Sequence, residues 1–284
     1  MNEQFSALEI LRKSSTFLSK KGIKSAKIDA EWIICNFLKI KKLDIYLDKH
    51  VISDEETLNK IRHAISRRAK REPLQHILGY VEFHGIMLKC DKRALIPRFE
   101  TEQLVDLISS NLPVGFQGSI LDFGTGSGAI IISLAKIYPH AKCLGVDKSV
   151  NCISLAKENV ILNKCDQHVD IIQYDWNNSS IYLDRVNVIV ANPPYLSEKE
   201  WLDTEPEVKE HDPKDALLSR KEGIYDLEKI IDIAPSLLCK SGLLALEIGH
   251  NQSEYLLKML NKHFRKSFIK KDFTGKRRFL LAML

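Results

Sequence analysis

The tetrapeptide Asn192-Pro193-Pro194-Tyr195 follows an apolar stretch and combines groups suited to reaction at a planar nitrogen. Such a nitrogen is a poor nucleophile because its lone pair is delocalised. The Asn192 side-chain oxygen and the Pro193 carbonyl can accept its two hydrogens in plane, which leaves the lone-pair face open. Pro194 supplies no competing N–H, and Tyr195 can stack on the flat group and stabilise growing positive charge. The tetrapeptide predicts methylation of an amide or aryl amine, the alternative being a Pro-Pro turn that ends a strand.

A glycine-rich segment between a predicted strand and a predicted helix is the second candidate site. Its residues are Gly124, Thr125, Gly126, Ser127 and Gly128. Glycine lets the backbone approach a ligand without a side chain in the way, and a helix N-terminus adds unpaired N–H groups. Asp147 ends the next predicted strand, where a carboxylate can accept both hydroxyls of a ribose. The pattern indicates a nucleoside cofactor, with a plain tight turn or a dinucleotide site as alternatives, although the glycine spacing differs from that of dinucleotide binders.

Both segments are expected at strand ends of an α/β domain that covers residues 97–284. Predicted strands lie at 119–123, 142–146, 169–174, 186–190, 243–248, 268–273 and 278–283, and predicted helices lie around 130–135, 153–160, 227–238 and 256–264. This alternation is typical of a mostly parallel, Rossmann-like sheet with helices on both faces. The last two strands are close enough in sequence to form an antiparallel hairpin.

The first 72 residues are predicted to form a small helical bundle. One helix face carries Ala30, Ile33, Ile34, Phe37 and Leu38 at helical spacing. Ser53 and Glu56 match a capping box at the start of another helix. Residues 73–96 are richer in strand-forming residues and are predicted to form a β-hairpin linker. The sequence therefore predicts three parts, with boundaries at residues 72 and 96.

The excess of basic residues is confined to the first third of the chain. Residues 1–90 hold 17 of the 42 Lys and Arg residues but only 11 of the 37 Asp and Glu residues, whereas the remainder is close to neutral. A basic module beside a neutral one favours a surface that docks a partner, either nucleic acid or an RNA-associated protein. A solvated helical surface is the alternative.

Cysteine spacing and hydropathy predict a protein of the reducing cytoplasm. The six cysteines are scattered without a Cys-x-x-Cys pair, and the nine histidines show no metal-ligand spacing, so no disulfide framework and no metal site is expected. No stretch reaches the roughly 18 apolar residues that span a bilayer. The N-terminus lacks the basic-then-apolar order of a secretory signal.

Longer motifs around both candidate sites resemble one family, the release factor glutamine methyltransferases (HemK/PrmC family) of the class I S-adenosylmethionine-dependent methyltransferases. The matching segments are 73–80, 83–85, 95–102, 120–135, 192–195, 212–217, 246–249 and 271–275. The resemblance spans nearly the whole catalytic domain and the linker. This chain departs from the family pattern at Phe99, where the family usually has Pro, and at 219–223, which is a poor copy of a more acidic, glycine-rich segment.

The resemblance implies S-adenosylmethionine as cofactor, bound by residues 124–128, with its ribose on Asp147, its adenine beside Trp176, and Asn192 also in contact. It implies methyl transfer to the glutamine of the Gly-Gly-Gln motif in class 1 peptide chain release factors, gripped by the helical domain. Under it Asn192, Pro193 and Tyr195 are catalytic, and Pro194 joins them in binding substrate.

Two other functions stay open. A nucleic-acid amino methyltransferase, such as an adenine-N6 enzyme, would share the tetrapeptide, but the chain lacks an obvious target-recognition insertion, so direct nucleic-acid binding is not expected. A non-catalytic docking module would not need an intact glycine loop and an intact Asn192–Tyr195 segment. No membrane partner is expected.

Overall fold

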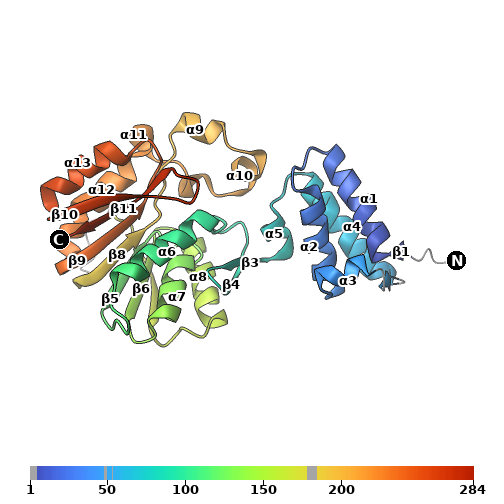
Figure 1. Cartoon of the computed structure of the whole chain (residues 1–284), viewed down its shortest axis with the longest axis horizontal. Helices are drawn as coiled ribbons and strands as arrows, with labels where there is room; N and C mark the ends of the chain where they lie inside the picture. Colours follow the sequence, from blue (N-terminus) through green and yellow to red (C-terminus); the bar gives the residue numbers. More distant parts are fainter. Residues whose placement is uncertain (1–4, 48–49, 53, 178–183) are drawn as a thin grey trace. The chain divides into compact units, whose positions relative to one another are not determined.

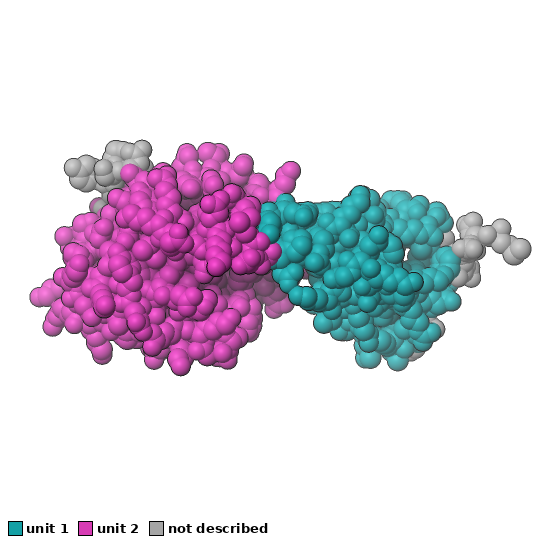
Figure 2. Space-filling model, turned by 90° about the horizontal axis from the view of Figure 1, so that it is seen from above, with its two compact units in different colours: residues 1–79, 205–211 teal, residues 80–204, 212–284 magenta. Residues whose placement is uncertain are grey.

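The chain is organised as two compact units. A computed structural model describes residues 5–47, 50–52, 54–177 and 184–284. One unit comprises Met1–Gly79 together with Glu205–His211, and the other comprises Tyr80–Thr204 together with Asp212–Leu284 (Figure 2). The division falls at Gly79 rather than at residue 72, and a short segment from the second half of the sequence belongs to the N-terminal unit.

The N-terminal unit is a helical bundle, as its hydrophobic period predicts. Its elements are β1 (Phe5–Ser6), α1 (Ala7–Lys20), α2 (Ala26–Leu38), α3 (Lys42–Tyr46), β2 (Val51–Ile52), α4 (Glu55–Ala69), α5 (Leu74–Leu78) and α10 (Pro206–His211) (Figure 1). The bundle core is formed by buried aliphatic side chains of α1, α2 and α4. Asp54 caps α4 by accepting the backbone N–H groups of Glu56 and Thr57. Ser53, the predicted cap, lies outside the described residues.

Residues 74–78 form the short helix α5 instead of the predicted strand-like segment. Pro73 precedes the first turn, where a missing N–H costs nothing. Gly79 ends the helix with a left-handed φ of 82° and donates its N–H to the Gln75 carbonyl at 2.8 Å. Five residues are too few for a helical period to show in the sequence. The predicted hairpin itself follows, as β3 (Tyr80–Phe83) paired antiparallel with β4 (Ile86–Lys89).

The second unit is built on a seven-stranded sheet in the order β10-β11-β9-β8-β5-β6-β7 (Figure 1). Its strands are β5 (Ser119–Phe123), β6 (Lys142–Asp147), β7 (Val169–Gln173), β8 (Val186–Ala191), β9 (Leu238–Glu247), β10 (Lys266–Lys271) and β11 (Arg277–Met283). Strands β5 to β9 pair in parallel, whereas β11 is antiparallel to both β9 and β10. The Rossmann-like sheet and its C-terminal hairpin are confirmed, although β9 begins at Leu238 rather than at residue 243.

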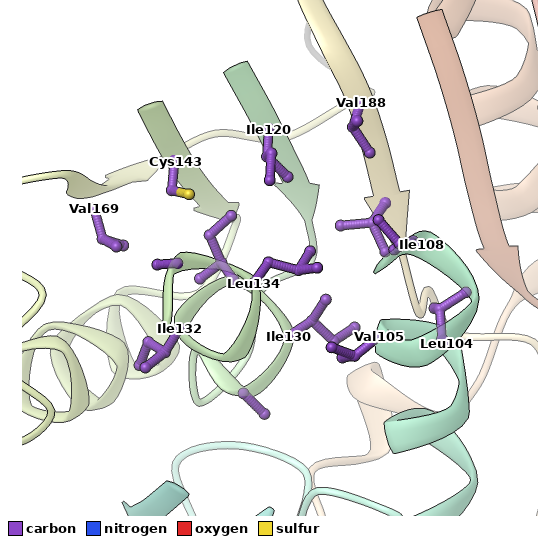
Figure 3. Packing of buried hydrophobic residues seen from close by; sticks show 14 of the residues in the cluster. Leu104, Val105, Ile108, Ile120, Ile130, Ile132, Leu134, Cys143, Val169 and Val188 are labelled. Atoms are coloured by element: carbon purple, nitrogen blue, oxygen red, sulfur yellow. The ribbon is translucent and has the colours of Figure 1, made fainter. Parts of the chain in front are cut away.

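Helices of the second unit pack on both faces of this sheet. Those that contribute to the two cores are α6 (Phe99–Asn111), α7 (Ala129–Ile137), α8 (Val150–Leu162), α12 (Tyr225–Leu237) and α13 (Ser253–His263). The same unit also contains the short helices α9 (Glu198–Leu202), η1 (Lys214–Ala216) and α11 (Arg220–Gly223). Side chains alternate across a strand, and Ile120 joins a core with α6, α7 and α8, whereas Leu121 joins a core with α12 and α13. Figure 3 shows Ile120 and Val188 in the first core, with Leu134 of α7 and Ile108 of α6. Helix α6 was not predicted.

The sheet order brings the candidate segments together. Strands β8, β5 and β6 are neighbours and run parallel, so their carboxyl ends lie at one edge. The tetrapeptide follows β8, the glycine loop follows β5, and Asp147 ends β6. Ligands of open α/β sheets bind at this edge.

Candidate active site

A cavity of about 340 Å³ lies in the second unit, among residues that follow the ends of β5, β6 and β8. Its lining includes these predicted residues: Gly124, Thr125, Gly126, Ser127, Asp147, Trp176, Asn192 and Pro194. Three other predicted residues, Gly128, Pro193 and Tyr195, do not line it. Most of the predicted cofactor site thus surrounds one cavity, which also includes part of the tetrapeptide.

The glycine loop is tied to the end of β6 by its backbone. Gly124 and Thr125 both donate their N–H groups to the Val146 carbonyl, at 2.8 and 2.9 Å. Gly124 has a φ of 69°, and a Cβ added there would lie 3.4 Å from the Trp176 ring. The Cβ would be in van der Waals contact with the indole, but the positive φ would strain any other side chain, so this position favours glycine.

Asp147 is buried at the cavity wall and has room for further donors. One carboxylate oxygen accepts the Gly126 N–H at 3.0 Å, and the other accepts the Ser149 N–H at 2.9 Å. Burial raises the pKa of Asp147, whereas these two bonds favour its charged form. A carboxylate accepts about four hydrogen bonds, so the group suits the two hydroxyls of a ribose.

Asp122 lies beneath the glycine loop, and the sequence patterns assigned it no role. It is fully buried, and one oxygen accepts the Thr125 hydroxyl at 2.7 Å. Burial, assisted by the charge of Asp147, raises the pKa of Asp122 to about 7 although Thr125 opposes the shift. The loop therefore rests on a second carboxyl group besides Asp147.

Trp176 forms an apolar wall of the cavity. Its Nε1 donates to Asp226 Oδ1 at 3.0 Å, and its ring meets Phe123 edge-on with centroids 6.3 Å apart. The indole is thus held in one orientation with its polar atom satisfied. This geometry suits a flat aromatic ligand, and the contact with adenine stays a prediction.

Asn192 is fixed by a hydrogen-bonded chain that the sequence did not predict. Its Nδ2 donates to Thr101 Oγ1 at 3.0 Å, and the Thr101 hydroxyl donates to Glu247 Oε2 at 2.7 Å. The Tyr195 hydroxyl donates to Glu247 Oε1 at 3.2 Å, and Arg278 Nη1 donates to the same hydroxyl at 3.4 Å. The four side chains with which Asn192 is connected come from α6, β9, β11 and the tetrapeptide.

Glu247 is the centre of this chain and is fully buried. Burial raises its pKa, whereas Thr101, Arg278 and Tyr195 stabilise the charged form. Burial also raises the pKa of Tyr195, and the Glu247 charge adds to that shift. Tyr195 therefore stays a neutral phenol whose hydroxyl points to Glu247. Its predicted stacking on the substrate stays a prediction.

The segment after the tetrapeptide returns to the cavity. Residues 213–216 line it, and Arg98 forms an ion pair with Asp212 at 2.5 Å. Within 219–223, the segment that departs from the family pattern, Gly223 has a φ of 86°, and an added Cβ would lie 2.3 Å from the Tyr195 carbonyl oxygen. Gln252 donates to that same carbonyl at 2.8 Å. The tetrapeptide backbone is thus supported from two further segments.

Solved structures show the same fold at low sequence identity. The hMettl16 catalytic domain, solved in complex with MAT2A 3'UTR hairpin 1, has a TM-score of 0.56 and 16% identity, covering 81% of this chain and 80% of that one. A methyltransferase from Pyrococcus furiosus has a TM-score of 0.50 and 15% identity, covering 69% of this chain and 87% of that one. At this level of identity, the two structures support the fold of this chain and nothing about its function.

Curated relatives are closer in sequence. Proteins named release factor glutamine methyltransferase are 36% identical over 277 residues in Fusobacterium nucleatum, covering 97% of this chain and 78% of the relative, and 31% identical over 288 residues in Chlorobaculum tepidum, covering 98% and 97%. Residues 9–79 match the PrmC N-terminal domain, and residues 100–208 match the methyltransferase small domain. Fold and site define a class I S-adenosylmethionine-dependent methyltransferase. Within that class, the chain belongs to the release factor glutamine methyltransferases.

Among the described residues, none of the helices is both long and apolar enough to cross a bilayer. The same part of the chain contains no group of three or more His, Cys, Asp or Glu side chains placed to hold a metal ion.

Proposed function

We propose that this protein transfers the methyl group of S-adenosylmethionine to the side-chain amide nitrogen of the glutamine in the Gly-Gly-Gln motif of class 1 release factors. The observation that carries the proposal is Asn192 at the cavity, with its Nδ2 held by Thr101. Its Oδ1 is then directed away from Thr101 and can accept a hydrogen of an incoming amide. Membership of the family supports glutamine as the amide.

The residues of the chain bind and orient the cofactor and the substrate amide, and they do not activate either one chemically. The backbone of 124–128 and Asp147 would hold the cofactor, which supplies an already activated methyl group when bound. Asn192 Oδ1 and the Pro193 carbonyl would hold the two amide hydrogens in plane, with the nitrogen lone pair facing the methyl group. The nitrogen becomes acidic as it is alkylated, so no base with a shifted pKa is required. Orientation of the two reactants supplies much of the rate.

The helical unit is proposed to dock the release factor. Its family match and the basic excess of residues 1–90 support a surface that binds a partner outside the reaction site. A substrate that acts in translation termination places the enzyme in the cytoplasm. Direct binding of nucleic acid forms no part of the proposal.

Labelled S-adenosylmethionine tests the proposal directly. The enzyme is incubated separately with a class 1 release factor, with the same factor carrying alanine in place of the motif glutamine, and with duplex DNA and RNA. We expect label in the first sample alone, at the glutamine nitrogen by mass spectrometry. Label in nucleic acid and none in the release factor would establish the amino methyltransferase alternative instead.

A further inference from the structure

The hydroxyl of Thr101 joins a carboxylate to the reaction motif. Thr101 lies on the buried side of α6 beside Leu104 and Ile108, and its side chain is 4% exposed. It touches Asn192 on one side and Glu247 on the other, at 3.0 and 2.7 Å. A polar residue on an otherwise apolar helix face must find partners inside the protein. Here both partners belong to the site.

The chemistry of these groups determines which way each hydrogen bond runs. Glu247 is surrounded by donors, because Thr101 and Tyr195 donate to its oxygens and Arg278 Nη1 lies 4.0 Å from Oε1. A hydroxyl has one hydrogen, and that of Thr101 is used in the bond to Glu247 Oε2. The Thr101 oxygen can then only accept from Asn192. It therefore selects the Nδ2 arm of the amide.

We propose that Thr101 and Glu247 are positioning residues that hold Asn192 with its Oδ1 turned to the substrate amide. Without them the Asn192 amide could rotate by half a turn and present two N–H donors to a substrate that also offers N–H donors. The Thr101 hydroxyl thus transmits the acceptor character of Glu247 across two hydrogen bonds. The inference rests on the proposed function only in requiring a substrate with an N–H₂ group.

The first test replaces Thr101 with valine, which has a similar shape and no hydroxyl. Because misplacement by about 1 Å costs roughly a hundredfold in rate, we expect kcat on release factor to fall by about 10- to 100-fold. Cofactor affinity by calorimetry and the KM for release factor should change by less than about threefold. Thr101→Ser restores the hydroxyl and should recover most of kcat. Ser133→Ala removes an equally buried hydroxyl, which bonds only within α7, and should leave kcat unchanged.

A double-mutant cycle tests whether Glu247 acts through Thr101. Glu247→Gln keeps the shape, but its new N–H₂ can donate to the Thr101 oxygen and free the hydroxyl to donate to Asn192 Oδ1. We expect a loss of kcat similar to that of Thr101→Val, and a double variant no worse than either single one, because the two residues act as one unit. Additive losses would overturn the relay.

A measurement without substrate separates this inference from the proposed function. The Asn192 side-chain N–H₂ signals can be assigned by their loss in Asn192→Ala, and they should shift in Thr101→Val while the Thr101→Ser spectrum stays close to wild type. Absence of release factor methylation by the wild type would end the proposed function alone. Unshifted Asn192 signals, near-normal kcat in Thr101→Val, or no recovery in Thr101→Ser would overturn the positioning role.

Discussion

Each unit contains a buried network of charged side chains, and the two networks end differently. In the helical unit, Arg68 donates to Asp29 at 2.6 Å and to Glu207 at 2.9 Å, so one cation lies between two carboxylates. In the catalytic unit, Glu247 accepts a hydrogen bond from Thr101, and Thr101 in turn accepts one from Asn192 at the cavity. A charge that ends in ion pairs joins segments of the fold. A charge that ends at a cavity wall sets the chemistry of a functional group.

The Arg68 network also explains why residues 205–211 belong to the helical unit. Glu207 belongs to α10, which lies in sequence between the tetrapeptide and Asp212 yet is part of the N-terminal unit. Arg71 adds a second bond to Glu207 at 3.3 Å, and Lys24 pairs with Glu205 at 2.6 Å. Basic residues of the first third are thus partly used within their own unit. The charge excess alone overstates the surface free for docking.

The largest expected effect comes from removing Arg68, the cation of the network that ends in ion pairs. Arg68→Met leaves the buried Asp29 carboxylate without its cation and removes one of the two arginines that bond to Glu207. Breaking a buried pair in this way costs about 3–5 kcal/mol. The free energy of unfolding, measured with urea, should fall by that amount. Lys60→Met is the matched control, because the Lys60 pair with Glu56 is 55% and 76% exposed and such pairs contribute about 0–1 kcal/mol. Under conditions where the variant is folded, kcat on a short glutamine peptide should stay near wild type. Unchanged stability with lost kcat would reverse the comparison.

Asn192→Ala removes the side chain at which the network of the catalytic unit reaches the cavity. The lost acceptor acts where the substrate amide is oriented, and deleting one such group typically costs about 10²–10³ in kcat. The fold and most of the cofactor affinity should be retained, since Asp147 and the glycine loop are untouched. Single-turnover kinetics with release factor and circular dichroism would separate these effects. Turnover near wild type would mean that the tetrapeptide is only a turn.

Asp147→Ala tests the cofactor wall of the same cavity. Hydrogen bonds to a charged acceptor contribute about 1.5–3 kcal/mol, so S-adenosylmethionine should bind roughly ten- to a hundredfold more weakly. The variant also releases the Gly126 and Ser149 N–H groups, which adds to the loss. Calorimetric titration gives the affinity directly. Affinity equal to wild type would remove Asp147 from the cofactor site.

Sequence patterns predicted the sheet because its central strands, such as β5 and β8, are short and mostly apolar. Helix α6 was missed because Thr101 interrupts its apolar stripe of Leu104, Val105 and Ile108. That interruption is itself a usable signal, since a polar residue on a buried helix face needs a partner. Helix α5 was missed because it is too short to show a period.

Local motifs predicted the glycine loop, Asp147 and Asn192 because each lies at the carboxyl end of a strand of the same parallel sheet. The support of Asn192 could not be predicted in this way. Thr101, Glu247 and Arg278 lie far from it in sequence. Glu247 and Arg278 come near it because β9 lies between β8 and β11, and Thr101 does so because α6 packs on the sheet. Thr101 and Glu247 lie within two of the segments that resemble the family, 95–102 and 246–249, but the resemblance assigned them no role. Pairing across a sheet depends on strand order, which local patterns leave open.

The smallest expected effect concerns an exposed network of similar geometry in the catalytic unit. Glu158 of α8 accepts from Arg93 at 2.6 Å and from Lys89 at 2.5 Å, and these bonds lower its pKa to about 2. The Glu158 side chain is 38% exposed, so solvent screening reduces the stabilisation to less than about 1 kcal/mol. Because the pKa is lowered in the folded state, the contribution is present above pH 4.5 and is lost as the pH falls towards 2.

Glu158→Gln measures this contribution. At pH 7 and low ionic strength, the variant should unfold in urea with a free energy lower by less than about 1 kcal/mol. The difference should shrink in 1 M salt, where charges are screened over about 3 Å, and as the pH falls to about 2, where roughly half of the wild-type Glu158 is protonated. Arg68→Met should keep its larger effect in salt, because buried pairs are screened much less. A salt-insensitive loss of several kcal/mol in Glu158→Gln would contradict this comparison. It would show that an exposed network can contribute as much stability as a buried one, and that the bonds from Arg93 and Lys89 hold β4 and α8 together as firmly as Arg68 holds α10.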